Sequence, residues 1–536
     1  MDSKVYLRTA LSQAPRLLGL ADRNPNSPTY GCFDRQYWHY RVVDFPCSRM
    51  QEAVLTLALL YKTPNAGYRS EKILGLANGG ISFWSGIQNR DGSFNEWYPN
   101  EGSYVATAFS LYAVCESIRL LGVKPDDATL NAIAKSAKFI STYGEFQATN
   151  QECGAALALL KASAALGEEK YAELSKSKIG ALLSKQDKEG WFSEYGGADI
   201  GYLSLAIDYL SKYYKESGDG RLLNSLSRAV DFIRYFIHPT GSAGGEYGSR
   251  NTEYLIPHGF EILAKKHPPA AAISSSIRKS LSSEGLNIDD RYLAYNLYTY
   301  LQAYSDAGKL NPPPLPHSTQ FTKYFSSSGL YVHSSKNAYL IYSAKKGSLK
   351  VYKKKPAKLL LSDCGYYGAL KSGKRIGSSV LDECAKTEAG NSVKTDTSLF
   401  YQSYPLPKTS NVLALRAAMK LNMLSPSKKA VKAAFRRMLI TKSRRAGVTL
   451  TREIVPGDVL VVRDTLRNSG KHPLSKLYMS DKFSVSFIPS SKYFLKEELS
   501  AELPMENLSS KLNSGKVVVE KRLDIKAEKL EVSISA

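Results

Sequence analysis

Two glycine-rich clusters hold most of the candidate residues for proton transfer and anion binding. The first covers residues 190–202 and the second residues 238–258, and each is expected to lead into a helix. Glycine lets the backbone adopt positive φ and approach a ligand closely, while Tyr, His, Asn and Arg provide proton donors and anion contacts. The clusters therefore predict a site that binds an anion and moves a proton.

The second cluster contains the candidates for proton transfer. Removing a proton from the carbon next to a carboxylate requires an acid, a base and groups that neutralise that carboxylate. Tyr254 or Tyr247 is the predicted acid or base. His258, expected in the first turn of a helix whose free amides attract anions, is a second base or a neutralising group. Asn251 and Arg250 are predicted to hold the carboxylate.

The first cluster carries side chains suited to bind the hydroxyl groups of a sugar. Asp199 and Tyr202 are three residues apart and share one helical face. Glu194 and Asp199 are also candidates for the carboxylate pair of a glycoside hydrolase. The remaining candidates lie at the start of another helix or carry rings that stack on sugars: Asn150, Trp191 and Trp38.

Each candidate has a purely structural alternative. The aromatic residues could pack in the core, and Arg250 could form an ion pair with Glu246 or Glu253. The sequence shows no HxH, HExxH or Cys/His ligand pattern, no P-loop and no Rossmann glycine fingerprint. We therefore expect no cofactor, while a metal site built from distant residues stays an open alternative.

The net charge of +23 is concentrated in two runs without acidic residues. Eight lysines lie between Lys336 and Lys358, and eight Lys and Arg residues lie between Lys428 and Arg445. Such runs favour an anionic partner, either an acidic poly- or oligosaccharide or an anionic membrane contacted peripherally. Nucleic acid is not expected, because no nucleic-acid-binding motif accompanies the charge.

The sequence carries no pattern typical of export. Residues 1–24 hold only short apolar patches, and no apolar run reaches the roughly 18 residues that span a bilayer. The six cysteines lack CxxC or metal-ligand spacing, which favours free thiols in a reducing compartment. We expect a cytoplasmic protein, with peripheral membrane association as the alternative.

The elements that must position these residues are helices up to about residue 310. A phrase of Gln, three residues, Gly, one residue and an aromatic recurs at Gln88–Phe94 and Gln186–Phe192, which indicates repeated helical hairpins. The pattern predicts an α/α toroid, an incomplete barrel of hairpins, with an irregular bundle or solenoid as the alternative. Apolar recurrence at three and four residues marks the expected helices: Arg49–Tyr61, Tyr104–Leu121, Leu130–Tyr143, Ala155–Leu166, Tyr171–Lys185, Gly201–Tyr214, Leu222–Ile237, Gly259–Lys266 and Asp290–Ala307.

A proline-rich segment, Asn311–Pro316, separates these helices from short alternating strands. We predict a toroid domain over residues 1–310, a linker over 311–320 and an antiparallel β-sandwich over 321–536. Within this strand-rich region, a short basic helix is the alternative prediction for Lys428–Leu439. The expected strands are Gly329–Ser334, Ala338–Ser343, Ser348–Lys353, Val412–Leu421, Val448–Ile454, Val459–Leu466, Lys482–Ile488 and Lys516–Ile525.

This order of domains, with the runs at residues 194–202, 245–254 and 448–464, resembles the heparinase II/III-like and alginate-lyase-like polysaccharide lyases. Uronyl C5-epimerases are a more distant relation. The resemblance implies C5-proton abstraction from a uronate-containing poly- or oligosaccharide, by a lyase or an epimerase. Without an export pattern, a role in building or modifying a surface polysaccharide fits equally well. The alternatives are a toroid glycoside hydrolase and a non-catalytic glycan-binding or assembly protein.

Overall fold

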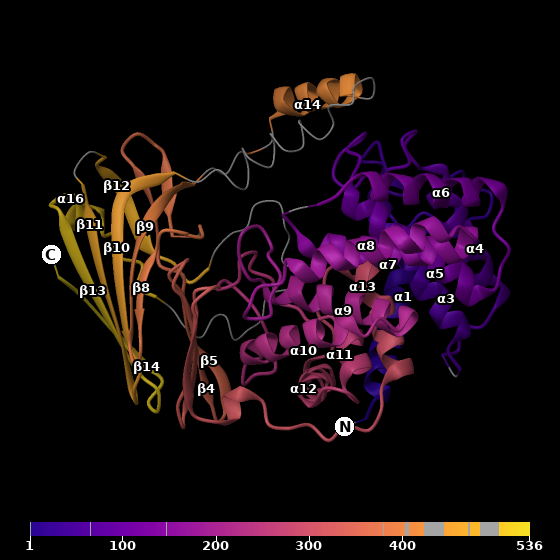
Figure 1. Cartoon of the computed structure of the whole chain (residues 1–536). Helices are drawn as coiled ribbons and strands as arrows, with labels where there is room; N and C mark the ends of the chain where they lie inside the picture. Colours follow the sequence, from indigo (N-terminus) through magenta and orange to yellow (C-terminus); the bar gives the residue numbers. More distant parts are fainter. Residues whose placement is uncertain are drawn as a thin grey trace.

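The chain folds into a ring of helices followed by two antiparallel sheets (Figure 1). The computed structural model describes all residues except 1, 65, 146, 379, 403–405, 407, 423–443, 470–471, 483–502 and 536. The predicted fold class, an N-terminal α/α toroid with a C-terminal β-sandwich, is confirmed. The last toroid helix ends at Asp306 and the first strand begins at Phe321. The predicted domain limits fall between these two residues.

Six inner helices form a closed ring, since each contacts the next and α13 contacts α3. The inner helices are α3 (Ala53–Lys62), α5 (Tyr104–Leu121), α7 (Thr149–Leu166), α9 (Ile200–Ser217), α11 (His258–Leu263) and α13 (Asp290–Asp306). The outer helices are α1 (Lys4–Leu20), α4 (Glu71–Gly86), α6 (Asp127–Thr142), α8 (Glu169–Ser184), α10 (Arg221–Ile233) and α12 (Pro268–Glu284). Short helices fill the connections: α2 (Arg35–Trp38), η1 (Ser48–Glu52), η2 (Arg234–Phe236) and η3 (Pro316–Ser318).

The connections differ in length at the two ends of the ring. Connections from an inner to the next outer helix are short, as at residues 122–126 and 167–168. Most connections from an outer to an inner helix are long, as at residues 87–103, 185–199 and 237–257, while residues 285–289 between α12 and α13 are an exception. Because successive helices in hairpins run in opposite directions, all the long loops lie at one end, beside the N-termini of the inner helices. Both glycine-rich clusters therefore share this end, which we call the loop end.

The repeated Gln phrase builds the same turn twice. Gln88 donates to the carbonyl of Gly92 (3.2 Å) and Gln186 to that of Gly190 (2.8 Å). The same side-chain amides donate to a carbonyl of the following outer helix, at 2.8 and 2.9 Å. Both glycines have positive φ, and a Cβ atom on either would lie within 2.3 Å of a backbone oxygen of that helix. Hairpin packing therefore explains the repeat.

Helix α5 is the one described helix with the length and apolar composition of a membrane span. Within its most apolar window, 83% is buried in the protein, because the helix belongs to the inner ring. Such burial is typical of a core helix.

The two sheets pack face to face (Figure 1). The five-stranded sheet is a meander of β1 (Phe321–Phe325), β2 (Leu330–Ser334), β3 (Ala338–Ser343), β4 (Ser348–Lys354) and β5 (Ala357–Asp363). The nine-stranded sheet has the order β12-β6-β7-β9-β10-β11-β13-β14, with β8 paired to β9. Its strands are β6 (Tyr366–Leu370), β7 (Arg375–Gly377), β8 (Lys386–Ala389), β9 (Val393–Gln402), β10 (Arg445–Val455), β11 (Val459–Asn468), β12 (Leu474–Met479), β13 (Lys516–Asp524) and β14 (Lys529–Ser535). Helix α16 (Ser509–Asn513) precedes β13.

The five-stranded sheet is buried on both faces. Tyr339 and Ile341 of β3 pack into the core of the toroid, while Leu340 and Tyr342 pack against the nine-stranded sheet. Side chains alternate between the faces of a strand, so the smaller sheet lies between the toroid and the larger sheet. The turn between β3 and β4 consequently reaches the loop end of the toroid.

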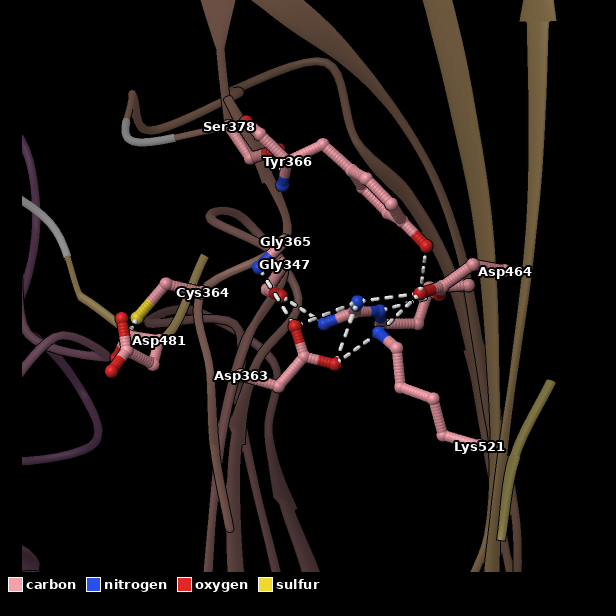
Figure 2. A network of polar contacts seen from close by, with 10 residues as sticks. Gly347, Asp363, Cys364, Gly365, Tyr366, Ser378, Asp464, Asp481 and Lys521 are labelled. Atoms are coloured by element: carbon pink, nitrogen blue, oxygen red, sulfur yellow. Dashed lines mark hydrogen bonds and ion pairs between the residues drawn. The ribbon is translucent and has the colours of Figure 1, made fainter. Parts of the chain in front are cut away.

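A cluster of buried charges joins the two sheets (Figure 2). Arg452 of β10 donates to Asp464 (2.6 and 2.7 Å), to Asp363 (3.0 and 3.1 Å) and to the carbonyl of Gly347 (2.5 Å). Lys521 donates to both aspartates, at 2.5 and 2.8 Å. All four charged side chains are fully buried, and their two positive and two negative charges balance. We call this group the inter-sheet charge cluster.

Some of the predicted helices and strands differ from those of the structure, and others lie outside the described residues. The predicted strand Val412–Leu421 is wrong: helix α14 (Thr409–Asn422) occupies it, because Ala, Leu, Arg and Met are strong helix formers. The structure adds helices α1, α4 and α12, which were not predicted. The predicted basic helix Lys428–Leu439 lies outside the described residues, as does the predicted strand Lys482–Ile488 apart from Lys482 itself.

Candidate active site

The loop that precedes α11 is fastened to the start of α9. Asp199 is the N-cap of α9: its carboxylate accepts from the backbone amides of Tyr202 (3.2 Å) and Arg250 (2.9 Å). The hydroxyl of Thr252 contacts the same carboxylate and accepts from the amide of Gly201 (2.8 Å). The structure thus gives the predicted sugar ligand Asp199 a positioning role, since its fully buried carboxylate holds the two clusters together.

Arg250 is a buried cation whose guanidinium lacks a full set of partners. The residue is 8% exposed, and its Nε and Nη2 atoms are buried without a hydrogen-bond acceptor. The predicted alternative partners, Glu246 and Glu253, instead pair with Lys350 at 2.6 and 3.0 Å. The guanidinium carbon lies 4.5 Å from the centre of the Tyr195 ring. Burying a charge without hydrogen bonds is costly, so these N–H groups are suited to an incoming anion.

Asn251 presents its amide in a defined orientation. The residue has φ of +57°, which asparagine tolerates better than most residues. Its Oδ1 atom accepts from Nζ of Lys346 at 2.5 Å, and an ammonium group can only donate. The oxygen is therefore fixed toward Lys346, which leaves the Nδ2 group as the donor for a ligand. Asn251 is partly exposed, so a ligand can reach it.

Tyr254 belongs to a group of partly exposed tyrosines beside this loop. Its ring centre lies 6.4 Å from that of Tyr202 and 5.7 Å from that of Tyr292. Burial raises the pKa of Tyr254 and of Tyr202 well above the ordinary tyrosine value, while the charge of Arg250 acts to lower the pKa of Tyr202. Both phenols are consequently protonated at neutral pH in the ligand-free protein and can donate a proton.

Tyr247 is enclosed, unlike Tyr254. Its hydroxyl lies 2.8 Å from Nε2 of His238, whose Nδ1 atom lies 2.8 Å from the hydroxyl of Ser242. The imidazole ring of His238 stacks on Tyr352 of β4, with ring centres 4.4 Å apart. Tyr247 and His238 are each 2% exposed, so this closed network joins the loop to the five-stranded sheet. The geometry favours Tyr254 over Tyr247 for proton transfer.

His258 does not lie at the loop end. Its Nε2 atom is 2.6 Å from the carboxylate of Asp306, the last residue of α13, while the loops lie beside the first turn of that helix. Burial lowers the pKa of His258 against the raising influence of Asp306 and Asp208. The predicted catalytic His258 is therefore an internal tie between α11 and α13. Helix α11 is short, so its start lies deep in the ring.

The other predicted sugar ligands serve the protein interior. Asn150 donates to Glu194 through its backbone amide (2.7 Å) and its side chain (2.8 Å), and both residues are buried. Burial raises the pKa of Glu194 to about 8. Trp191 donates to a carboxylate of Glu189 (3.1 Å), and Trp38 donates to a backbone carbonyl of α1 (2.8 Å). The polar groups of all four thus have partners within the protein, while the stacking of the Trp191 and Trp38 rings on a sugar stays a prediction.

Lys346 is the residue near the site that sequence reasoning missed. It lies in the β3–β4 turn, and the sequence analysis treated it only as part of a basic run. Other lysines of that run pair with Glu383, Glu246 and Glu253, or Glu528. The run therefore largely secures contacts within the protein. Among the described residues, no three His, Cys, Asp or Glu side chains are grouped to hold a metal ion.

This fold is that of toroid polysaccharide lyases. The chondroitin AC lyase of Streptomyces coelicolor A3, solved with chondroitin sulphate, matches with a TM-score of 0.55 at 11% identity, over 88% of this chain and 67% of that chain. A Paenibacillus xanthan lyase matches with a TM-score of 0.52 at 10% identity, over 88% of this chain and 46% of that chain. This chain thus spans less than half of the xanthan lyase.

At the level of sequence, residues 44–256 match the family described as the Ulvan lyase N-terminal domain. The match begins just before η1 and ends just before α11, so it includes the first glycine-rich cluster and the second as far as residue 256. No curated protein matches the chain in sequence. The predicted resemblance to the polysaccharide lyase superfamily is confirmed.

Proposed function

We propose that the protein is an enzyme that abstracts the C5 proton of a uronate residue in an acidic polysaccharide or oligosaccharide and eliminates the 4-linked sugar. The carrying observation is the buried guanidinium of Arg250, whose Nε and Nη2 atoms have no acceptor. A uronate carboxylate supplies the two oxygens that such a planar fork binds best. The position beside the N-termini of the inner helices also favours an anion.

Binding in this position activates the C5 proton. When that proton leaves, negative charge spreads into the carboxylate, and donors already fixed around it stabilise the charge. Arg250 supplies one set of donors, and the Nδ2 group of Asn251 supplies another. Neither donor has to give up an internal carboxylate partner first, because Glu246 and Glu253 pair with Lys350.

The tyrosines supply the proton transfers. In our proposal Tyr202 acts as the base: its phenolic proton is first released to solvent, which the charge of Arg250 favours although burial opposes it, and the phenolate then accepts the C5 proton of the bound substrate. The electrons of the C5–H bond form the C4=C5 double bond, the C4–O4 bond breaks, and Tyr254 donates its proton to O4. An epimerase would share the first step but return a proton to C5 from the opposite face. The lyase outcome is proposed because the chondroitin AC lyase and the xanthan lyase, two proteins with the same fold, are lyases.

A hydrolase pair receives less support from the geometry. Glu194 and Asp199 are fully buried, and each accepts hydrogen bonds from the backbone of the protein. Neither carboxylate is free to protonate a glycosidic oxygen or to activate water on the other side of a sugar. The Arg250 site, in contrast, suits a substrate that itself carries the carboxylate.

The test follows two products in parallel. The purified protein is incubated with ulvan, chondroitin sulphate and xanthan, and the ultraviolet absorbance of the unsaturated product and deuterium uptake at C5 are measured. A rise in absorbance, reduced about 100-fold or more in Tyr254→Phe, supports the lyase. Tyr478→Phe, in β12 of the larger sheet, is the matched control. Deuterium uptake without absorbance would establish an epimerase, and silence in both assays would reject C5 chemistry on these polymers.

A further inference from the structure

The turn between β3 and β4 inserts a lysine into the toroid. Nζ of Lys346 donates to Oδ1 of Asn251 (2.5 Å) and to the backbone carbonyl of Gly248 (2.8 Å). Lys346 is 2% exposed, and the residues it binds lie almost 100 positions earlier in the chain. A buried ammonium group held by an amide oxygen and a carbonyl is not a solubilising surface charge.

From this geometry we infer that Lys346 is a positioning residue of the uronate site: it fixes the Asn251 amide so that its N–H donors face the substrate carboxylate. This inference rests on the function proposed above. Without Lys346, the amide could rotate by half a turn and direct an oxygen toward the carboxylate, which would repel it. The β-sandwich then completes the site as well as supporting the toroid.

The surroundings of Lys346 make this role sensitive to pH. Burial lowers its pKa to about 8, although Cys364, Glu246 and Asp199 raise it, and the nearby cation Arg250 lowers it further. Below pH 8 the ammonium holds the Asn251 oxygen. Above pH 8 the neutral amine can also accept a hydrogen bond, so it no longer dictates which side of the amide it faces. The kcat/KM value, which reports the protonation state of the free enzyme, should therefore decline as the pH rises through about 8.

The first experiment compares three variants on an active polymer. Lys346→Met is expected to lower kcat/KM by about 10- to 100-fold, the size expected for one charge-assisted hydrogen bond, and to abolish the alkaline limb near pH 8. Lys346→Arg keeps a permanent charge, so it should restore part of the activity and shift the limb upward. Lys345→Met is the matched control on the same turn, since Lys345 pairs only with Glu383 among described acidic groups and does not contact Asn251. A Lys346→Met enzyme with the activity and pH profile of the wild type overturns the inference.

A second readout separates this inference from the proposed function. The protein is labelled with ¹⁵N on asparagine side chains, and the Asn251 signal is assigned by its loss in Asn251→Ala. In the wild type this signal should shift with pH around a midpoint near 8, and the shift should be absent in Lys346→Met. This titration needs no substrate, so it holds even where every polymer proves inert and the proposed function fails. If the Asn251 signal changes neither with pH nor with the Met substitution, the inference is overturned. The proposed lyase activity is not affected by that result.

Discussion

Arg452 and Arg250 are both buried arginines, and they differ in how completely the protein surrounds them. Arg452 binds two aspartates and a carbonyl inside the inter-sheet charge cluster, where positive and negative charges balance (Figure 2). Arg250 has two nitrogens without an acceptor, and the nearby glutamates pair with Lys350 instead. A buried cation whose acceptors lie within the protein supports the fold. A buried cation that lacks such acceptors is suited to bind an anionic ligand.

The largest effect is expected where the internal partners are complete. Arg452→Met would leave two buried aspartates with only Lys521 to balance them, and should lower the free energy of unfolding by about 3–5 kcal/mol. Urea denaturation measures this change. The matched control is Arg463→Met on the adjacent strand, where an exposed arginine pairs with Glu520 and little should change. Equal stability of Arg452→Met and wild type would contradict a structural role for the cluster.

At Arg250, whose guanidinium lacks a full set of internal acceptors, we expect a loss of activity without a loss of stability. Arg250→Met should lower kcat/KM by about 100- to 1,000-fold, as does loss of a donor to a developing oxyanion. Its stability should equal or exceed that of the wild type, because a poorly compensated buried charge is removed. Steady-state kinetics and urea denaturation on the same preparation measure both. An unstable but fully active Arg250→Met protein would reverse the comparison and assign Arg250 to the fold.

The smallest expected effect is on the free energy of unfolding at acidic pH. Burial disfavours the charged form of Asp464, but Arg452 and Lys521 outweigh it and hold its pKa well below the usual aspartate range. A depressed pKa stabilises the fold above the unfolded value of about 4, and this contribution is lost as the pH falls below it. The free energy of unfolding should therefore fall with pH below about 4, less steeply in Asp464→Asn.

The acid slope also separates the two arginines. Arg250→Met should keep the acid slope of the wild type, since Arg250 belongs to a different group of charges. Thermal unfolding monitored by circular dichroism at several pH values measures all three proteins. An Asp464→Asn slope identical to that of the wild type would remove the inter-sheet charge cluster as the source of acid sensitivity.

Helices with strong apolar periodicity were predictable, while α1, α4 and α12 were not. The expected helix Tyr104–Leu121 matches α5, because burial in the inner ring demands a long apolar stretch. Helix α4 was missed because its glycines suggest a loop. Its Gly79 and Gly80 are needed for packing: a Cβ atom on either would lie within 2.6 Å of the side chain of Tyr30 or Val54. The requirement comes from distant neighbours that the local sequence does not reveal.

The site was predictable only where it is local. Arg250, Asn251 and Tyr254 lie within five positions, so a single glycine-rich loop revealed them. His258 was predicted as a base or a neutralising group and Asp199 as a sugar ligand. A polar residue at a helix start has the same sequence pattern whether it acts on a substrate, caps a helix or ties two helices together. Only the partners decide between these roles, and those partners are set by tertiary packing.

The β3–β4 turn also bears on how the protein matures during synthesis. Asn251 precedes its partner by 95 positions, so the whole toroid, whose last helix ends at Asp306, is synthesised before Lys346 is added. At roughly 5–20 residues per second, Lys346 is added about 5–20 s after Asn251. We expect the carboxylate site to stay incomplete until the β3–β4 turn has been synthesised and has packed against the toroid, so that a chain acquires full activity only after its second domain has folded against the first.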